Sequence, residues 1–481
     1  MGKGKTEIYI IAACILFIVV LATFFHFEVH YENVLANLPE PEFGVQISVW
    51  RIVFEPVIGL LLFFNRSIYA LKELPLALLW AAIFYFLFSL RHVVTTGEVR
   101  KKVLLKKVAN IPLILGICFS IFIVLLFIPL PNNTIINQSK SSVLVTTHAH
   151  TEYSHDGLIS QKGMWNWHKR NGFDAFFITD HADHKKSLDF QQAQRNDEFE
   201  KAPLVMVGQE HSGSNHMSLL GLNGRFDTKG MADKAVIDSV HKYGGIVIVN
   251  HWFDGKGKEK EFYRDLGADG FEIENVGTDL YYDRELFKEL KTFCSNAGLT
   301  MVGGLDFHGY GRMCSVYNAL EIPNWKTMEP LEKEQAILGV LKNGPQDKIK
   351  ILMYKDRDFY TEANLVFRPF LSFVNYFRTL NVLQTISWIF WLLLLLFASK
   401  KYKRLSFDAD RSIVVAAAVC TVFLLVLAGL YYYKGQVVKG YSEVYSEYFG
   451  ILGVIGLILL LYVSILAYLR FFRKLISENK K

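Results

Sequence analysis

Two histidines, His148 and His150, open the stretch of this sequence that is best suited to chemistry. They follow a short apolar run at 143–145, which predicts a buried strand that ends at the histidines. On an extended strand both imidazoles point to the same face, and converging neutral imidazoles are good metal ligands. His155 and Asp156 follow within the next turn and can fold back over the same point. A His-x-His pair alone does not exclude an ordinary polar loop, so the interpretation depends on the rest of the chain.

The residues from about 140 to 350 repeat this pattern, because short apolar runs alternate there with amphipathic helical stretches. The apolar runs predict strands with polar ends, which are 174–178 with Asp180 and His181, 204–207 with Glu210 and His211, 246–249 with Asn250 and His251, and 300–303 with Asp306 and His308, while His216 opens a strand at 217–222. Such βα repetition predicts a parallel sheet. In a closed parallel barrel the carboxyl ends of the strands gather at one mouth. Packing needs alone do not explain so many imidazoles and carboxylates, since burying them without partners is costly.

These motifs resemble those of the polymerase-and-histidinol-phosphatase (PHP) domain family over about residues 141–350. The motifs are His148-Ala149-His150, Thr179-Asp180-His181, Glu210, Asn250-His251 and Asp306-Phe307-His308, and they occur in this order. The resemblance implies an α/β fold with a distorted seven-stranded βα barrel, a trinuclear metal site and metal-dependent phosphoester hydrolysis. By position it implies a set of metal ligands, which are His148, His150, Asp156, His181, Glu210, His216, His251, Asp306 and His308. Glu210 resembles the family's bridging carboxylate.

Two positions of this ligand set stay open. The chain reads Ser-His-Asp-Gly at 154–157, where many members of the family have Ser-Asp-Gly. Either His155 or Asp156 is therefore the ligand, with Asp156 preferred. His216 competes with His211, because the sequence between them does not show which imidazole turns inward.

Two further residues are candidates for a role beside the metals. Asp180 is expected to orient a ligand imidazole. Arg312 follows the Asp306–His308 motif and is a candidate for binding a substrate phosphate, with an ordinary surface arginine as the equal alternative. The remaining histidines of this region are expected on solvated helices and loops, and they are His168, His184 and His241.

The ligand types favour manganese, iron or zinc over magnesium or calcium, because several imidazoles accompany the carboxylates. The resemblance implies that a trio of such divalent ions is bound. Closely spaced metals lower the pKa of a bound water and supply hydroxide as the nucleophile. They also neutralise charge on a phosphoryl group in the transition state. The sequence contains no Ser-His-Asp or Cys-His arrangement that competes convincingly.

Long apolar runs flank this region and account for a hydrophobic content of 51% in a chain of 481 residues. They divide the chain into an N-terminal transmembrane region at 1–135, a metal-dependent hydrolase domain at 140–365 and a C-terminal transmembrane region at 366–481. Six of the runs are long enough to span a bilayer, and they lie at 8–25, 74–90, 111–130, 382–398, 412–432 and 449–469. Most clustered lysines and arginines adjoin these runs, so the net charge of +6 gives no indication of nucleic acid.

The positive residues beside the spans predict how the chain crosses the membrane. Basic segments at 91–107 and 400–411 are placed in the cytoplasm together with both termini. Residues 131–381 then lie on the extracytoplasmic side of a multi-pass protein of the cell membrane. This count requires that 47–64, which charged residues and a proline interrupt, forms a re-entrant or interfacial segment. Residues 366–381 predict an amphipathic helix on the membrane surface.

The sequence therefore predicts a membrane-embedded, metal-dependent phosphatase or phosphodiesterase. Its expected partners are membrane lipid and either a phosphorylated small molecule or a lipid-linked phosphate, since the spans either anchor the domain or present a substrate. Few polar residues lie within the spans, which argues against a transporter. Two alternatives remain, an amidohydrolase-like metallohydrolase and a non-enzymatic membrane sensor that binds a metal or ligand. The first is less favoured, because no lysine stands at a clear strand end to bridge metals.

Overall fold

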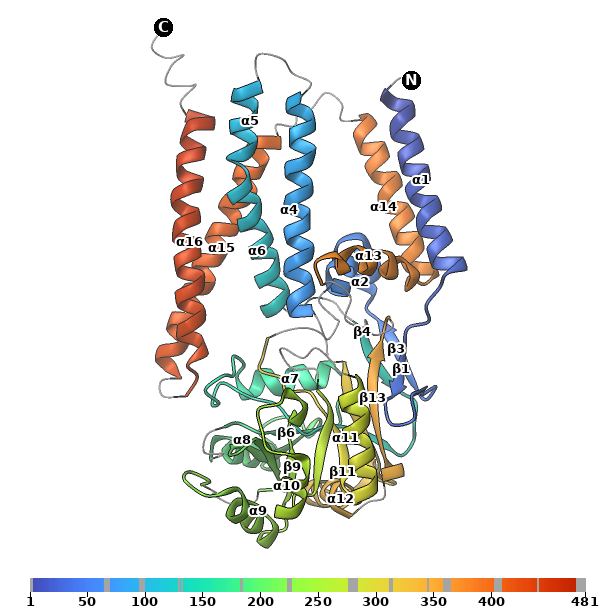
Figure 1. Ribbon diagram of the computed structural model, residues 1–481, viewed down its shortest axis with the longest axis vertical. Helices are drawn as coiled ribbons and strands as arrows, with labels where there is room; N and C mark the ends of the chain where they lie inside the picture. Colours follow the sequence, from blue (N-terminus) through green and yellow to red (C-terminus); the bar gives the residue numbers. More distant parts are fainter. Residues whose placement is uncertain are drawn as a thin grey trace.

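The chain folds into a group of long helices and an α/β part that lies against one end of them (Figure 1). The start of α1 (Lys3–Phe24) and the end of α16 (Val444–Ala467) lie at the opposite end of the helical group. The computed structural model describes residues 3–64, 70–94, 100–128, 130, 133–181, 185–222, 227–275, 284–310, 315–343, 346–357, 365–401, 409–438 and 441–472.

The α/β part is built on an 11-stranded sheet. Its strands, in the order in which they pair, are β11 (Thr300–Gly304), β10 (Gly270–Asn275), β9 (Ile246–Val249), β8 (His216–Leu220), β7 (Leu204–Ser212), β6 (Ala175–Ile178), β5 (Ser142–Thr146), β12 (Val316–Glu321), β13 (Ile349–Lys355), β1 (His30–Asn33) and β2 (Leu38–Pro39). The N-terminal strands β1 and β2 thus extend the same sheet. Two other strands, β3 (Phe43–Ile47) and β4 (Asn133–Asn137), pair with each other separately.

The sheet is mixed, which corrects the prediction of a parallel sheet. The pairs β5–β6, β6–β7, β9–β10 and β10–β11 are parallel. In contrast, β8 runs antiparallel to both β7 and β9, and β12 and β13 run antiparallel to their neighbours. The connection from β7 to β8 is only residues 213–215. It is too short for the helical crossover that a parallel pair needs, so these strands form a hairpin.

One edge of the sheet, β11, also approaches β12 without forming a ladder with it. The side chain of Asn318 on β12 accepts a hydrogen bond from the backbone N–H of Gly303 at 2.7 Å and donates one to its carbonyl at 2.8 Å. An isolated parallel bridge joins Ala149 and Phe307 beyond the strand ends. The paired strands of the described chain therefore do not complete the closed seven-stranded barrel that the resemblance implies.

Six helices surround this sheet, and they are α7 (Gln161–Arg170), α8 (Lys185–Arg195), α9 (Asp233–Lys242), α10 (Lys260–Leu266), α11 (Arg284–Ala297) and α12 (Pro330–Asn343). Successive residues of the central strands alternate between two apolar clusters. Phe176 belongs to one cluster with Ile237 of α9, and Phe177 belongs to the other with Ile337 of α12. Burial on both faces explains why the strands appear in the sequence as continuous apolar runs.

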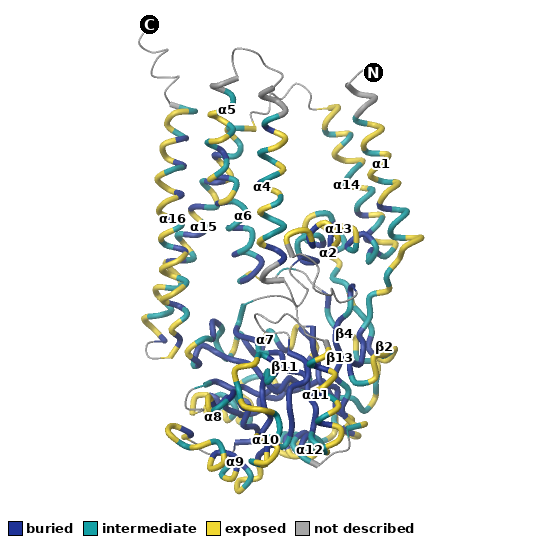
Figure 2. Tube along the Cα trace, in the orientation of Figure 1, coloured by how far each residue is buried: buried dark blue, intermediate teal, exposed yellow. Residues whose placement is uncertain are grey.

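The helical group contains six stretches that are long and apolar enough to cross a membrane. They are formed by α1 (Lys3–Phe24), α4 (Ala70–Val94), α5 (Arg100–Val108) with α6 (Ile111–Phe127), α14 (Val382–Lys401), α15 (Ala409–Val437) and α16 (Val444–Ala467). Each of the six apolar runs of the sequence lies mainly in one of them. Exposed positions recur along their length (Figure 2), and many carry large apolar side chains such as Phe88, Val419 and Leu461. This pattern is typical of helices with apolar surroundings.

The interrupted segment 47–64 forms three short helical pieces, α2 (Val49–Val53), the π-helix η1 (Glu55–Gly59) and α3 (Leu60–Phe64). Pro56 has no N–H to donate, which breaks the regular helix. The carbonyl of Val53 accepts hydrogen bonds from the side chains of Trp391, at 2.7 Å, and Ser387, at 3.2 Å. The segment therefore forms no single long regular helix.

The predicted amphipathic helix is α13 (Arg368–Arg378). It lies crosswise at the ends of α1 and α14 that face the sheet (Figure 1). Tyr376 and Phe377 are buried against Ile18 of α1, while Phe370 and Phe373 are exposed. The helix thus has a packed face and an exposed apolar face.

Candidate metal centre

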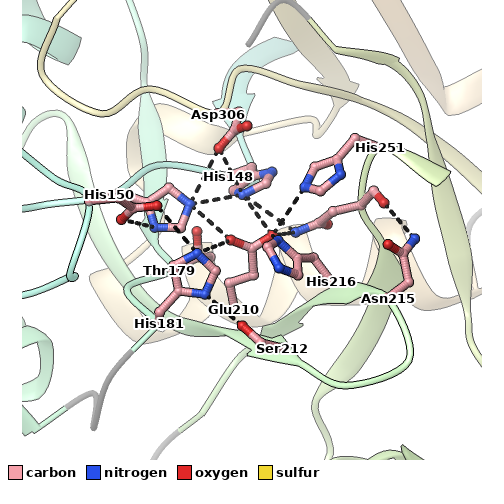
Figure 3. Close-up of polar contacts among 12 residues, drawn as sticks. His148, His150, Thr179, His181, Glu210, Ser212, Asn215, His216, His251 and Asp306 are labelled. Carbon is pink, nitrogen blue, oxygen red and sulfur yellow. Dashed lines mark hydrogen bonds and ion pairs between the residues drawn. The ribbon is translucent and has the colours of Figure 1, made fainter. Parts of the chain in front are cut away.

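Imidazoles and carboxylates from six strands meet where these strands end, on one side of the sheet (Figure 3). His148 and His150 follow β5, His181 follows β6, Glu210 lies on β7, His216 begins β8, His251 follows β9, and Asp306 and His308 follow β11. The carboxyl ends of the parallel strands all lie on this side. Because β8 is antiparallel to its neighbours, its first residue lies there as well.

Glu210 lies at the middle of this cluster and is buried. Both of its carboxylate oxygens lie within 3.5 Å of imidazole nitrogens. Oε1 is 3.2 Å from His148 Nε2, 3.2 Å from His216 Nδ1 and 3.5 Å from His251 Nε2, and Oε2 is 3.1 Å from His150 Nε2 and 3.0 Å from His181 Nε2. A carboxylate that faces imidazoles from both oxygens is well placed to bridge two cations.

Asp156 forms the second group of contacts. Its Oδ2 lies 3.0 Å from His308 Nε2 and 3.4 Å from His181 Nε2, and its Oδ1 lies 3.9 Å from His150 Nδ1. His181 therefore contacts both Asp156 and Glu210. Asp306 completes the set, since its Oδ1 is within 3.4 Å of Nε2 of both His148 and His150.

The spacing of these donor atoms fits bound divalent cations. Nε2 of His148 and Nε2 of His150 are 3.0 Å apart, near the separation of about 3.3 Å that two imidazole ligands have around a tetrahedral zinc ion. Four overlapping groups of three side chains bring their donor atoms within 4.8 Å of one another, and these groups are His148, His150 and Glu210; His150, Asp156 and His308; His155, Asp156 and His181; and His181, Glu210 and His216. The mixture of nitrogen and oxygen ligands suits manganese, iron or zinc.

The charges of the cluster lead to the same conclusion. Burial favours the neutral form of the His150 imidazole, but the charge of Asp156 and hydrogen bonds with Asp306 and Glu210 raise its pKa to about 10. Burial alone would raise the pKa of Asp156, yet the neighbouring imidazoles hold it well below its usual range. The carboxylates thus require positive charge beside them, and either protons on the imidazoles or metal cations can provide it.

Glu272 is a functional candidate that the sequence analysis did not include among the site residues. Its Oε1 accepts a hydrogen bond from His148 Nδ1 at 2.8 Å, and its Oε2 accepts from the backbone N–H of His251 at 3.1 Å. Asn275 also donates to Oε2, at 3.0 Å. Glu272 therefore directs Nε2 of His148 toward the cluster. Its position inside an otherwise apolar strand was the signal that could have identified it.

Other polar side chains orient two further candidate ligands, His181 and His251. Ser212 contacts His181 Nδ1 at 3.1 Å, and Asp254 contacts His251 Nδ1 at 3.2 Å. The backbones of His251 and Asp306 have positive φ angles of 28° and 48°. Such conformations are uncommon for residues other than glycine and often occur at functional sites.

The structure distinguishes His216 from His211 but places both His155 and Asp156 near the cluster. His216 faces Glu210, whereas His211 turns away and its Nε2 lies 3.5 Å from Asp233. At the other position both candidates are close to the cluster. Asp156 contacts three imidazoles, and the exposed ring of His155 lies 4.7 Å from that of His181.

Asp180 has a different environment from the one predicted. Its two carboxylate oxygens accept hydrogen bonds from the N–H and the hydroxyl of Thr151, at 2.6 and 2.8 Å. It therefore fixes the chain just after His150 and does not orient an imidazole through these contacts. Arg312, the candidate for binding phosphate, lies outside the described residues, as does His184.

His168 was expected on a solvated helix face, and that prediction is wrong. The side chain is fully buried on α7, stacked on Phe176 at 4.1 Å between ring centroids. Its Nδ1–H donates to the carbonyl of Met164 at 2.9 Å. The basic neighbours in the sequence concealed the fact that His168 lies on the apolar face of the helix. His241, in contrast, is partly exposed and pairs with Asp269.

Comparisons with known proteins found only weak similarity to solved structures. No protein-family model matches the sequence, and no curated protein matches it. Among solved structures, the chain is similar to a two-domain protein from Bacteroides vulgatus described as containing a predicted PHP-like metal-dependent phosphoesterase (19% identity, TM-score 0.33, covering 48% of this chain and 69% of that one). It is also similar to PsfC from Pseudomonas syringae (15%, 0.31, 50% and 98%) and to an amidohydrolase from Chromobacterium violaceum with bound sulfate and no metal (12%, 0.28, 39% and 98%). At these TM-scores and identities, the similarities do not establish a family for the chain.

Proposed function

We propose that this protein is a metal-dependent phosphoesterase with a trinuclear site at the described cluster. The observation that carries the proposal is the placement of Glu210, whose two oxygens face imidazoles on both sides, beside the second carboxylate group at Asp156. The order of ligand motifs along the chain, which resembles that of the PHP family, supports the choice of phosphate esters.

The residues of the site have distinct roles in this proposal. Divalent ions held there would lower the pKa of a water molecule and offset the charge of a phosphoryl group. Glu210, Asp156 and His308 would be among the residues that hold these ions. Glu272 keeps His148 in the orientation that presents Nε2. Asp180, through Thr151, holds the loop that carries Asp156.

The six apolar helices support a proposal for location as well. We propose a multi-pass protein of the cell membrane, with the hydrolase region at about 140–365 on the extracytoplasmic side. The side is inferred from the basic segments beside the spans.

The function is tested by phosphate release from a panel of phosphomonoesters, nucleotides and lipid phosphates. Full-length protein in detergent would be assayed with added Mn²⁺, before and after chelation. We expect release that chelation abolishes, and loss of release in His148→Ala and Asp306→Ala. Retained activity in both variants would contradict the proposal.

If the protein is shown to hold metal but releases no phosphate, the two alternative functions can be told apart. An amidohydrolase-like enzyme would then be tested with amide and lactone substrates under the same conditions. Absence of any hydrolysis from metal-loaded protein would favour a sensor that binds a metal or ligand.

A further inference from the structure

The loop that carries Asp156 is attached to the start of α16, one of the membrane-length helices. The backbone N–H of Glu443 donates to the carbonyl of His155 at 2.7 Å. The hydroxyl of Ser442 donates to the carbonyl of Gly157 at 2.7 Å. These two bonds lie on either side of Asp156, so the end of the helical hairpin α15–α16 and this side of the cluster form one structure.

A second ligand lies beside the same helices. His308 is followed closely by Tyr310, and their ring centroids are 5.9 Å apart. Tyr310 in turn lies 6.4 Å from Phe127, at the end of α6, and 6.4 Å from Tyr448 of α16. Leu158 joins Tyr445 of α16 in an apolar cluster. The ends of α6, α15 and α16 thus border the Asp156–His308 side of the cluster.

This end of the helices has the properties of a membrane–water boundary. The 29 residues of α15 extend about 43 Å at 1.5 Å per residue, which exceeds the hydrocarbon thickness of about 30 Å. One or both ends of α15 therefore lie among lipid head groups. Tyrosines gather at the end near the cluster, at Tyr431–Tyr433, Tyr441, Tyr445 and Tyr448, and tyrosine is typical of the interface. The tyrosine-rich end of the hairpin, which borders the cluster, therefore has the composition expected at head-group level.

The hairpin also brings a positive charge to this place. Lys434 lies in the last turns of α15, and its Nζ is 3.3 Å from Oε2 of Glu152. Tyr445 donates to the same oxygen at 2.9 Å. Glu152 lies two residues after His150 and four before Asp156. The Lys434 side chain is 44% exposed, so an anionic head group can approach it from solvent and would compete with Glu152 for its ammonium.

We infer that the substrate is a phosphate ester with a long apolar tail, which stays in the bilayer while Lys434 binds its anionic head beside the metal cluster. This inference rests on the proposed function. In the reaction, an oxygen from water bonds to phosphorus and the P–O ester bond breaks. The alcohol leaves with a proton and remains in the membrane, and the phosphate departs into water. A free, short phosphate ester would gain nothing from the attachment of the ligand loop to the spans.

The test compares hexadecyl phosphate with butyl phosphate, which share a head group and differ in the tail. The corresponding p-nitrophenyl diesters extend the comparison to diester hydrolysis. Full-length protein loaded with Mn²⁺ would be assayed in phosphatidylcholine nanodiscs for release of phosphate or p-nitrophenol. We expect kcat/KM to favour the hexadecyl esters by about 100-fold or more, because each buried methylene contributes to retention. Hydrolysis of the butyl esters at an equal or higher rate would overturn the inference and leave the proposed function intact. No hydrolysis of any of these esters by metal-loaded protein would contradict both.

A pair of lysine variants tests the role of Lys434. Lys434→Gln is expected to raise KM for hexadecyl phosphate about tenfold, with a smaller change in kcat, since a hydrogen bond to a charged group is lost. Lys234→Gln is the matched control, because Lys234 is similarly exposed and also pairs with a carboxylate, but it lies on α9 far from the helical group. Equal KM values for the Lys434 variant, the control and the unchanged protein would overturn the assignment of Lys434.

Discussion

At the scale of single residues, the cluster is organised around one carboxylate. Glu210 contacts five imidazoles from four other strands, and only His148 and His150 among these histidines lie close together in the sequence, with Ala149 between them. A buried carboxylate of this kind needs positive charge beside it, which protonated imidazoles or bound cations would supply. The arrangement is therefore best explained as a binding site and not as a product of core packing.

Two histidines five residues apart provide a direct comparison within this cluster. His216→Gln should reduce metal content and activity, because His216 lies 3.2 Å from Glu210. His211→Gln should leave metal content unchanged, because His211 faces Asp233. Metal analysis of both purified variants checks this prediction. Equal loss in the two variants, or loss only in His211→Gln, would show that the imidazoles are wrongly assigned.

Glu272 is predicted to act as a positioning residue for His148. Glu272→Gln preserves size but weakens the acceptor for His148 Nδ1, so metal affinity should fall about 10- to 100-fold. Activity should then recover as the Mn²⁺ concentration is raised. Titration of activity against Mn²⁺ measures this shift, and an unchanged Mn²⁺ dependence would argue against the role. Loss of activity that excess metal does not restore would indicate a purely structural role.

At the scale of elements, the sequence was informative where strands are buried on both faces. The apolar runs at β5, β6, β7, β9 and β11 were predicted together with their polar ends. The direction of β8 was missed, although the short Gly-Ser-Asn connection at 213–215 favours a hairpin. The approach of β11 to β12, which form no ladder with each other, is made through the Asn318 side chain, and such side-chain contacts leave no local pattern to detect in the sequence. Glu272 was not included among the site residues, although an acidic side chain inside an apolar strand was a local signal, and its contact with His148, 124 residues away, could not be read from the sequence.

The packing of α7 against the sheet gives a prediction of pH dependence. Burial, only partly offset by the hydrogen bond with Met164, lowers the pKa of His168 from 6.5 to about 3. Between these values the unfolded chain binds a proton that the folded chain does not, so stability falls as the pH drops below 6.5. The slope from this group is up to about 1.4 kcal/mol per pH unit, and its contribution is complete above pH 6.5.

His168→Leu removes this titrating group while keeping an apolar side chain on the buried face. Thermal unfolding midpoints of both proteins, measured in detergent from pH 7.5 to 4.5, should differ in slope. The variant should lose less stability than the unchanged protein as the pH falls. Parallel curves would show that His168 is not the group responsible.

At the scale of the whole molecule, the α/β part and the helical group share structural elements. The N-terminal strand β1 pairs with β13 of the main sheet, and the loop at 151–158 is attached to α16. The cluster of imidazoles and carboxylates therefore has a fixed position relative to the ends of the long apolar helices. The six apolar segments were evident in the sequence by length and composition. The attachment of the site to them was not, because it depends on backbone groups of the loop and the hairpin.

The predicted orientation in the membrane can be tested by labelling intact cells. Ser141→Cys should react with an impermeant maleimide, because residues 131–381 are placed outside, whereas Ser406→Cys should not. The unchanged protein, which has its own cysteines, sets the background. Labelling only at position 406 would reverse the proposed topology.

The central claim is that the cluster around Glu210 holds catalytic metal ions. The most direct measurement determines the metal content and the rate of phosphate release on the same samples of unchanged protein and Glu210→Gln. We predict that the unchanged protein binds divalent ions and releases phosphate, and that Glu210→Gln loses at least one ion and nearly all activity. Full metal content and full activity in Glu210→Gln would contradict the account.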